Sequence, residues 1–265
     1  MRIAVAVKQV LDPDGVNGYA LWGKLALDSS GRKFAIGDTI PLIMNSYDEQ
    51  ALEVAFRIRD AGTPVEIVAF TVGPKASPEV LKRCFALGVD EAIQVETEDE
   101  LADGFAAGVL LAQAMKRFGP FDVVLCGRQG SDFDQGVVPG VLAEALDAAL
   151  IAVAAGVSAV DGTIRVEHVT PEGVATIEAS LPAVVSLSNE VGQVRYPTSR
   201  GMLEARRKRP QVIRAEEFGP MRPSIELVGL EVPDVQGHCE VIDGSSPQEK
   251  AAILFERLAS LGVVL

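Results

Sequence analysis

The stretch over residues 123–146 constrains the fold of this chain more than any other part of its sequence. It opens with an apolar run, 123–125, which is typical of a strand buried on both faces of a sheet. Residues 126–131 (CGRQGS) break the run as a glycine-bearing loop, and residues 138–146 follow with a helical pattern. A loop that leads from a strand into a helix N-terminus offers unpaired backbone N–H groups to an anion, most often a phosphate.

Two interpretations of this loop remain open from the local pattern. Its sequence is neither a GxGxxG nor a Walker motif, so spacing alone is a weak signal for a nucleotide. Asp132 and Asp134 could instead be the acids that cap an ordinary helix. The position of the loop in the whole fold has to decide between them.

Strands and helices alternate along the first two thirds of the chain. Buried strands are expected at 3–7, 65–72, 92–95, 123–125 and 181–187. Helical patterns between them predict right-handed βαβ units and a parallel sheet. We therefore expect an α/β fold with a doubly wound, mostly parallel, Rossmann-like sheet of order 3-2-1-4-5.

A sheet of this order reverses its direction of winding between the strands at 3–7 and 123–125. Ligands in open α/β sheets bind at this reversal, outside the carboxyl ends of the strands. Lys8 and residues 127–129 would meet there, next to the helix that follows Asp134. This places a ligand site but does not name the ligand.

The segments outside the alternating pattern are expected to be less regular. A turn is expected at 12–15, and residues 16–44 read as irregular with a hairpin around 28–31. Short antiparallel strands are expected within 157–178. We divide the chain into an α/β domain, 1–190, and an extended C-terminal arm, 191–265, that would pack on a partner subunit.

Composition excludes several classes of function. The net charge of −13 argues against nucleic acid or an anionic membrane surface as a partner. The sequence shows no secretory signal and no apolar run long enough to insert in a membrane. The three cysteines are odd in number and scattered, so they predict no disulfide framework and no metal cluster. With only two histidines, a histidine-based catalytic triad or a histidine-rich metal site is not expected either. A cytoplasmic protein without catalytic residues or metal ligands is therefore expected.

Several short motifs, taken in order, resemble one family. The chain is similar to the β subunit of electron-transfer flavoproteins over nearly its whole length. The segments that carry this resemblance are 4–10, 45–52, 72–74, 127–136 with 142–144, 181–185 and 195–201.

The resemblance implies a role as an electron carrier rather than an enzyme. The family is an αβ heterodimer in which an α subunit supplies most contacts to the FAD that carries electrons. The β subunit holds AMP, or a second FAD in the electron-bifurcating branch, in an adenine-nucleotide-binding α/β domain. It also presents a recognition loop to partner dehydrogenases and electron-acceptor proteins.

The resemblance also assigns residues by position. Ala6 and Lys8 would lie near the base, Asn45 near the ribose, with Val72 beside them. The phosphates would meet the backbone of Gly127 and of the run Asp134, Gln135, Gly136, Val137 and Val138. The partner-recognition residues would be Arg195, Tyr196, Pro197, Ser199 and Arg200.

The chain departs from the family pattern in three places. The family commonly has a glutamine and a threonine or valine before a glycine where this chain has Val137, Val138 and Pro139. Ser46 replaces a proline, and Ser199 replaces a leucine in the recognition loop. The first change is expected to alter nucleotide binding, and the last to alter docking, because an apolar anchor often dominates a small interface.

Two alternatives stay open at this point. One is a stand-alone nucleotide-binding protein of the stress-protein type, built on the same kind of sheet. The other is a paralogue that keeps the heterodimer but has lost the nucleotide. The absence of a paired acid–base set or a nucleophile–base set in the sequence argues against an independent enzyme.

Overall fold

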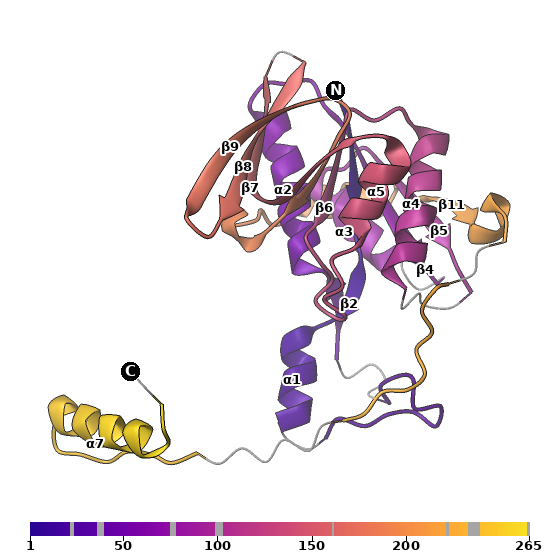
Figure 1. Ribbon diagram of the computed structural model, residues 1–265. Coiled ribbons are helices and arrows are strands. Elements are labelled where there is room, and N and C mark those ends of the chain that lie inside the picture. The colour runs from indigo at the N-terminus through magenta and orange to yellow at the C-terminus, as the bar shows by residue number, and fades with distance from the viewer. Residues whose placement is uncertain are drawn as a thin grey trace. The chain divides into compact units, whose positions relative to one another are not determined.

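The computed structural model (Figure 1) describes residues 1–21, 24–35, 40–74, 78–98, 103–160, 162–220, 223–232 and 239–263. The strands are β1 Arg2–Ala6, β2 Gln9–Leu11, β3 Leu42–Met44, β4 Glu66–Gly73, β5 Glu91–Glu96, β6 Val123–Gly127, β7 Ala149–Val160, β8 Thr163–Thr170, β9 Gly173–Ser180, β10 Ala183–Leu187 and β11 Gln211–Arg214. The helices are α1 Pro13–Leu21, α2 Ser46–Asp60, α3 Pro78–Leu87, α4 Gly104–Phe118, α5 Val138–Leu146, α6 Ser199–Ala205 and α7 Pro247–Ser260, with 3-10 turns η2 Asn189–Val191 and η3 Ala215–Phe218. The chain separates into two units, Met1–Glu231 and Val232–Leu265.

In the described residues, nine strands of the first unit form one sheet in the order β11-β5-β4-β1-β6-β10-β7-β8-β9. All neighbours from β11 to β7 pair in parallel, and β8 and β9 continue the sheet antiparallel. The antiparallel strands stand at one side of the sheet and β11 at the other (Figure 1). The run β5-β4-β1-β6-β10 confirms the predicted order 3-2-1-4-5.

The parallel strands are buried on both faces, as their continuous apolar runs predict. Along β1, Ile3 and Val5 pack in the core that contains Phe56 of α2, together with α3. Ala4 points the other way, into the core that contains Leu110 of α4, together with α5. Each large side chain buried in this way contributes roughly 1.5–3 kcal/mol to the stability of the sandwich.

The segment after β2 is more regular than predicted. Residues 13–21 form α1, whereas a turn and irregular chain were expected. The carbonyl of Asp12 accepts a hydrogen bond from the Val16 N–H, and Pro13 occupies the first helical position, so the Asp-Pro pair starts a helix. The hairpin around 28–31 is confirmed by the bridge between Leu27 and Phe34.

The antiparallel addition is confirmed, but its first strand is longer than expected. β7 begins at Ala149 because its first residues pair in parallel with β10 before the strand turns to pair with β8. Residues 42–44 form β3, which pairs antiparallel with β2 in a separate small sheet.

The first unit continues well beyond residue 190. β11 joins the sheet next to β5, and Ile213 is buried in the core beneath it. In the second unit, Ser246 caps α7 by accepting a hydrogen bond from the Glu249 N–H. The packing of the arm on a partner subunit stays a prediction. None of the helices in the described ranges has the length and apolarity that a membrane crossing requires.

Candidate functional site

A pocket lies at the carboxyl ends of β1 and β6, the neighbouring strands at which the winding of the sheet reverses. The structure brings together in its lining all ten residues expected at a nucleotide. They are Ala6, Lys8, Asn45, Val72, Gly127, Asp134, Gln135, Gly136, Val137 and Val138. Segments more than a hundred residues apart in the chain therefore form one site, as the topology predicts.

The loop between β6 and α5 reaches the helix through two residues with positive φ. Asp134 has a φ of 50° and Gly136 a φ of 63°. The helix begins at Val138, and its N-cap residue, Val137, offers no side-chain acceptor. Among the described residues, the backbone N–H groups of Gly136 and Val137 have no hydrogen-bond acceptor. This end of α5 is therefore open to an anion.

The alternative in which two aspartates cap this helix is wrong. The Asp132 carboxylate accepts the N–H of the adjacent Phe133, and the Asp134 carboxylate accepts from the Gln129 side chain at 2.6 Å. Both carboxylates shape the loop before the helix. The helix start is left without a side-chain cap.

Asn45 immediately precedes α2, but its side chain does not cap that helix. Its amide nitrogen donates to the Gln129 carbonyl at 2.8 Å, and its amide oxygen accepts the Ser131 N–H at 3.2 Å. Only 1% of the residue is exposed. The side chain of Asn45 therefore binds the backbone of the loop after β6. The contact of Asn45 with a ribose stays a prediction.

Asp48 lines the pocket although the sequence analysis did not assign it to the site. Its carboxylate accepts the backbone N–H of Lys8 at 2.7 Å and that of Gly127 at 3.0 Å. It therefore ties together the ends of β1 and β6. An acidic residue in the first turn of α2 reads as a helix-start signal, which hides this second role.

Burial gives Asp48 an unusual proton affinity. Desolvation raises the pKa of its carboxyl from 3.8 to about 7. Hydrogen bonds from the backbone of Lys8, the side chain of Asn45 and the backbone of Gly127 oppose this rise. The group therefore titrates in the physiological range.

Lys8, which is predicted to lie near the base, already has an ionic partner within the site. Lys8 forms an ion pair with Asp132, with Nζ and Oδ2 2.5 Å apart, and its ammonium lies 5.3 Å from the centre of the Phe133 ring. The side-chain oxygen of Gln135 accepts the Gly104 N–H at the start of α4 at 2.9 Å. The loop is thereby fastened to β1 and to α4.

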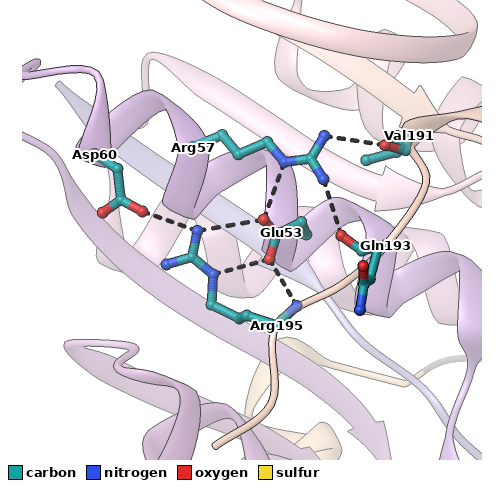
Figure 2. A network of polar contacts seen from close by, with 6 residues as sticks. All are labelled: Glu53, Arg57, Asp60, Val191, Gln193 and Arg195. Carbon is teal, nitrogen blue, oxygen red and sulfur yellow. Dashed lines mark hydrogen bonds and ion pairs between the residues drawn. The ribbon is translucent and has the colours of Figure 1, made fainter.

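Figure 2 shows how the predicted partner-recognition segment is held against α2. Glu53 of α2 accepts from the backbone N–H of Arg195 at 3.0 Å and from its guanidinium at 2.8 Å. Arg57 donates to the same carboxylate and to the carbonyls of Val191 and Gln193. Although burial alone would raise the pKa of Glu53, its hydrogen bonds with Arg195 and Arg57 lower it.

The remaining recognition residues are disposed differently. Tyr196 is 77% exposed. Thr198 caps α6 by accepting the Gly201 N–H, so that Ser199 is the first helical residue and is exposed. Arg200 pairs with Glu204 on the same helix. Arg195 is therefore the member of the predicted set that is committed to internal contacts.

Comparison with known proteins agrees with these features. The family described as "Electron transfer flavoprotein domain" matches residues 35–217. The chain is 28% identical to the caffeyl-CoA reductase–Etf complex subunit CarD of Acetobacterium woodii, over the full length of both proteins. It is 32% identical to the electron transfer flavoprotein subunit beta of Syntrophomonas wolfei, over 78% of this chain and 77% of that protein. It is 30% identical to the subunit beta of Megasphaera elsdenii, over 78% of this chain and 76% of the relative. The chain belongs to the electron-transfer flavoprotein β-subunit family.

Proposed function

We propose that this chain is the β subunit of a heterodimeric electron-transfer flavoprotein and that its pocket holds AMP or a second FAD. The observation that carries the proposal is the gathering of all ten predicted residues around the uncapped start of α5. An α subunit would share a FAD with this chain, and that flavin would carry the electrons. The chain would then act as a carrier subunit and not as an enzyme.

The residues of the pocket fit the phosphate of a nucleotide. The free N–H groups of Gly136 and Val137 and the positive end of the α5 dipole favour an anion. At Gly127, an added Cβ would run into the carboxylate of Asp48 and the backbone of Tyr47, so the loop needs glycine there to keep its shape. Binding through backbone N–H groups does not require the glutamine that Val137 replaces.

The cationic side chains of the pocket are consistent with a ligand that is held chiefly by the backbone. Lys8 is paired with Asp132, and the Arg128 guanidinium lies 5.6 Å from the centre of the Tyr47 ring. Both cationic groups already interact with other side chains of the protein. We therefore propose that Lys8 and Ala6 line the base end of the site and that the start of α5 binds the phosphate.

We further propose that the segment after Arg195 contacts dehydrogenases and electron-acceptor proteins. Tyr196, Ser199 and Arg200 are exposed there. Met202 and Leu203 of α6 add exposed apolar surface beside them, at 51% and 61% exposure. One relative is named as a subunit of a caffeyl-CoA reductase–Etf complex, which supports a role in assembly with a redox enzyme.

The cytoplasm is the proposed compartment. Cys84, Cys126 and Cys239 are free thiols, which suits a reducing environment. Cys84 and Cys126 are also buried, and burial raises the pKa of both thiols, so they are inert core residues rather than redox centres.

Co-expression with the α-type subunit of the same organism tests the assembly. The proposal predicts a stable 1:1 heterodimer with the visible absorbance of a bound flavin, which bleaches when a partner dehydrogenase and its substrate are added. A stable monomer that does not bind the α-type subunit would overturn the heterodimer and favour a stand-alone nucleotide-binding protein.

A further inference from the structure

We propose that Asp48 and Asn45 are positioning residues that shape the anion-binding end of the pocket and so determine its affinity for the phosphate of the nucleotide. The inference rests on the proposed nucleotide-binding function. In this proposal, residues at the start of α2 affect ligand affinity indirectly, because they fix the position of the loop after β6.

The carboxylate of Asp48 is committed to the backbone. One oxygen accepts the N–H of Lys8 and the other that of Gly127, so both face strand ends. The residue is 6% exposed, and a buried N–H that loses its acceptor is costly. Asp48 therefore fixes the point at which the loop leaves β6.

Asn45 fixes the next part of the same loop. Its amide donates to the carbonyl of Gln129 and accepts the N–H of Ser131, so one side chain spans three consecutive loop residues. Its own N–H donates to the carbonyl of Lys8 at 2.9 Å, which joins this support to the end of β1. The start of α2 thus grips residues 127–131 at three backbone positions.

The loop passes this constraint on to the free N–H groups. The carbonyl of Gly130 accepts the backbone N–H of Asp134 at 2.9 Å. The side chain of Gln129 donates a hydrogen bond to the carboxylate of the same Asp134. These contacts support the positive φ of Asp134, after which Gly136 turns the chain into α5. If Asp48 or Asn45 lost its hydrogen bonds to residues 127–131, the N–H groups of Gly136 and Val137 would therefore move.

Asp48→Asn is the sharpest change because it preserves size and removes one acceptor. The amide oxygen can still accept one backbone N–H, but the NH₂ group presents a donor to the other. The N–H of Lys8 or of Gly127 is then left without an acceptor. Glu49→Gln is the matched control, since it removes the same charge from the same turn of α2, where Glu49 pairs with Arg83 instead.

The experiment is calorimetric titration of the nucleotide-stripped heterodimer with two probes, AMP and adenosine. Asp48 and Asn45 hold the phosphate-end loop at three backbone positions, and Asp48 holds the base end only through the Lys8 N–H. We therefore expect Asp48→Asn to weaken AMP binding at least tenfold and adenosine binding by no more than about threefold. Glu49→Gln should leave both affinities within twofold of the wild type. An unspecific structural defect would weaken both probes equally.

Asn45→Ala provides a second route if Asp48→Asn does not give a folded complex. It releases the carbonyl of Gln129 and the N–H of Ser131. We expect a larger loss of affinity for AMP than for adenosine, because adenosine would lose only the predicted contact of Asn45 with the ribose. Wild-type AMP affinity in these variants, or an equal loss for adenosine, overturns the positioning role and leaves the proposed function standing. A wild-type complex that binds neither AMP nor FAD in this pocket overturns the nucleotide function itself.

Discussion

Glu53 and Arg195 are 142 positions apart in the chain, yet the carboxylate of Glu53 accepts both the backbone N–H and the guanidinium of Arg195 (Figure 2). The guanidinium also lies 4.8 Å from the centre of the Phe56 ring. The helix that carries Glu53 begins directly after Asn45 and carries Asp48 in its first turn. α2 is therefore the common support of the pocket and of the proposed partner surface.

Replacing Arg195 with alanine is expected to destabilise the first unit. The change removes two side-chain hydrogen bonds to the carboxylate of Glu53, which is 8% exposed, and an ion pair with Asp60 on the surface, although Arg57 remains to neutralise Glu53. We expect a loss of roughly 1–3 kcal/mol in the free energy of unfolding, measured by urea denaturation.

Arg200→Ala is the matched control for this variant. Arg200 lies in the same segment, but its partner Glu204 is on the surface of the same helix. Exposed pairs of this kind contribute little, so the urea midpoint should not change. Equal effects of the two variants would contradict the anchoring role of Arg195.

Gly127→Ala is expected to disrupt the pocket. An added Cβ would lie 2.6 Å from the Cβ and 2.9 Å from the carbonyl carbon of Tyr47, so the start of α2 would have to move. The heterodimer should then lose its second nucleotide on gel filtration.

Gly140→Ala tests the specificity of that effect. An added Cβ there meets nothing within 4 Å, and alanine is the better residue in a helix. This variant should keep the nucleotide and gain up to about 1 kcal/mol. Loss of the nucleotide in both variants would show that the pocket tolerates no change near α5.

The pH dependence of stability should carry the signature of Asp48. Burial raises the pKa of its carboxyl from 3.8 to about 7. Between about pH 4 and pH 7 the folded chain keeps a proton that the unfolded chain has released, so this group makes the free energy of unfolding fall as pH rises. The contribution is at most about 4 kcal/mol across that window.

Unfolding of the wild type and of Asp48→Asn between pH 5 and pH 8 isolates this contribution. Groups other than Asp48 act equally in both proteins, so the wild type should lose stability relative to the variant as pH rises. Parallel curves for the two proteins would contradict a raised pKa at Asp48.

The sheet and the location of the pocket were predictable because local patterns encode them. Apolar runs such as 123–125 mark strands that are buried on both faces, and alternation with helices restricts their order. The reversal of winding then places Lys8 beside Gly127. Resemblance to the family added the individual residues, and all ten line the pocket.

The missed features depend on contacts between distant parts of the chain. The first turn of α2 shows an acid at position 48, but only the fold reveals that its carboxylate reaches two strand ends. β11 is four residues long in a proline-rich region, and its pairing with β5 makes it a strand. Asp12 and Pro13 fit a turn as well as a helix start, so local chemistry could not separate the two.

The most direct test of the nucleotide-binding proposal is the nucleotide content of the purified heterodimer. The complex is denatured, and the released FAD and AMP are quantified per heterodimer. We expect a second nucleotide in addition to the shared FAD, either one AMP or one more FAD. A stable heterodimer with one FAD and no second nucleotide would contradict the proposal, and would mean that the chain keeps the assembly but has lost the ligand of its pocket.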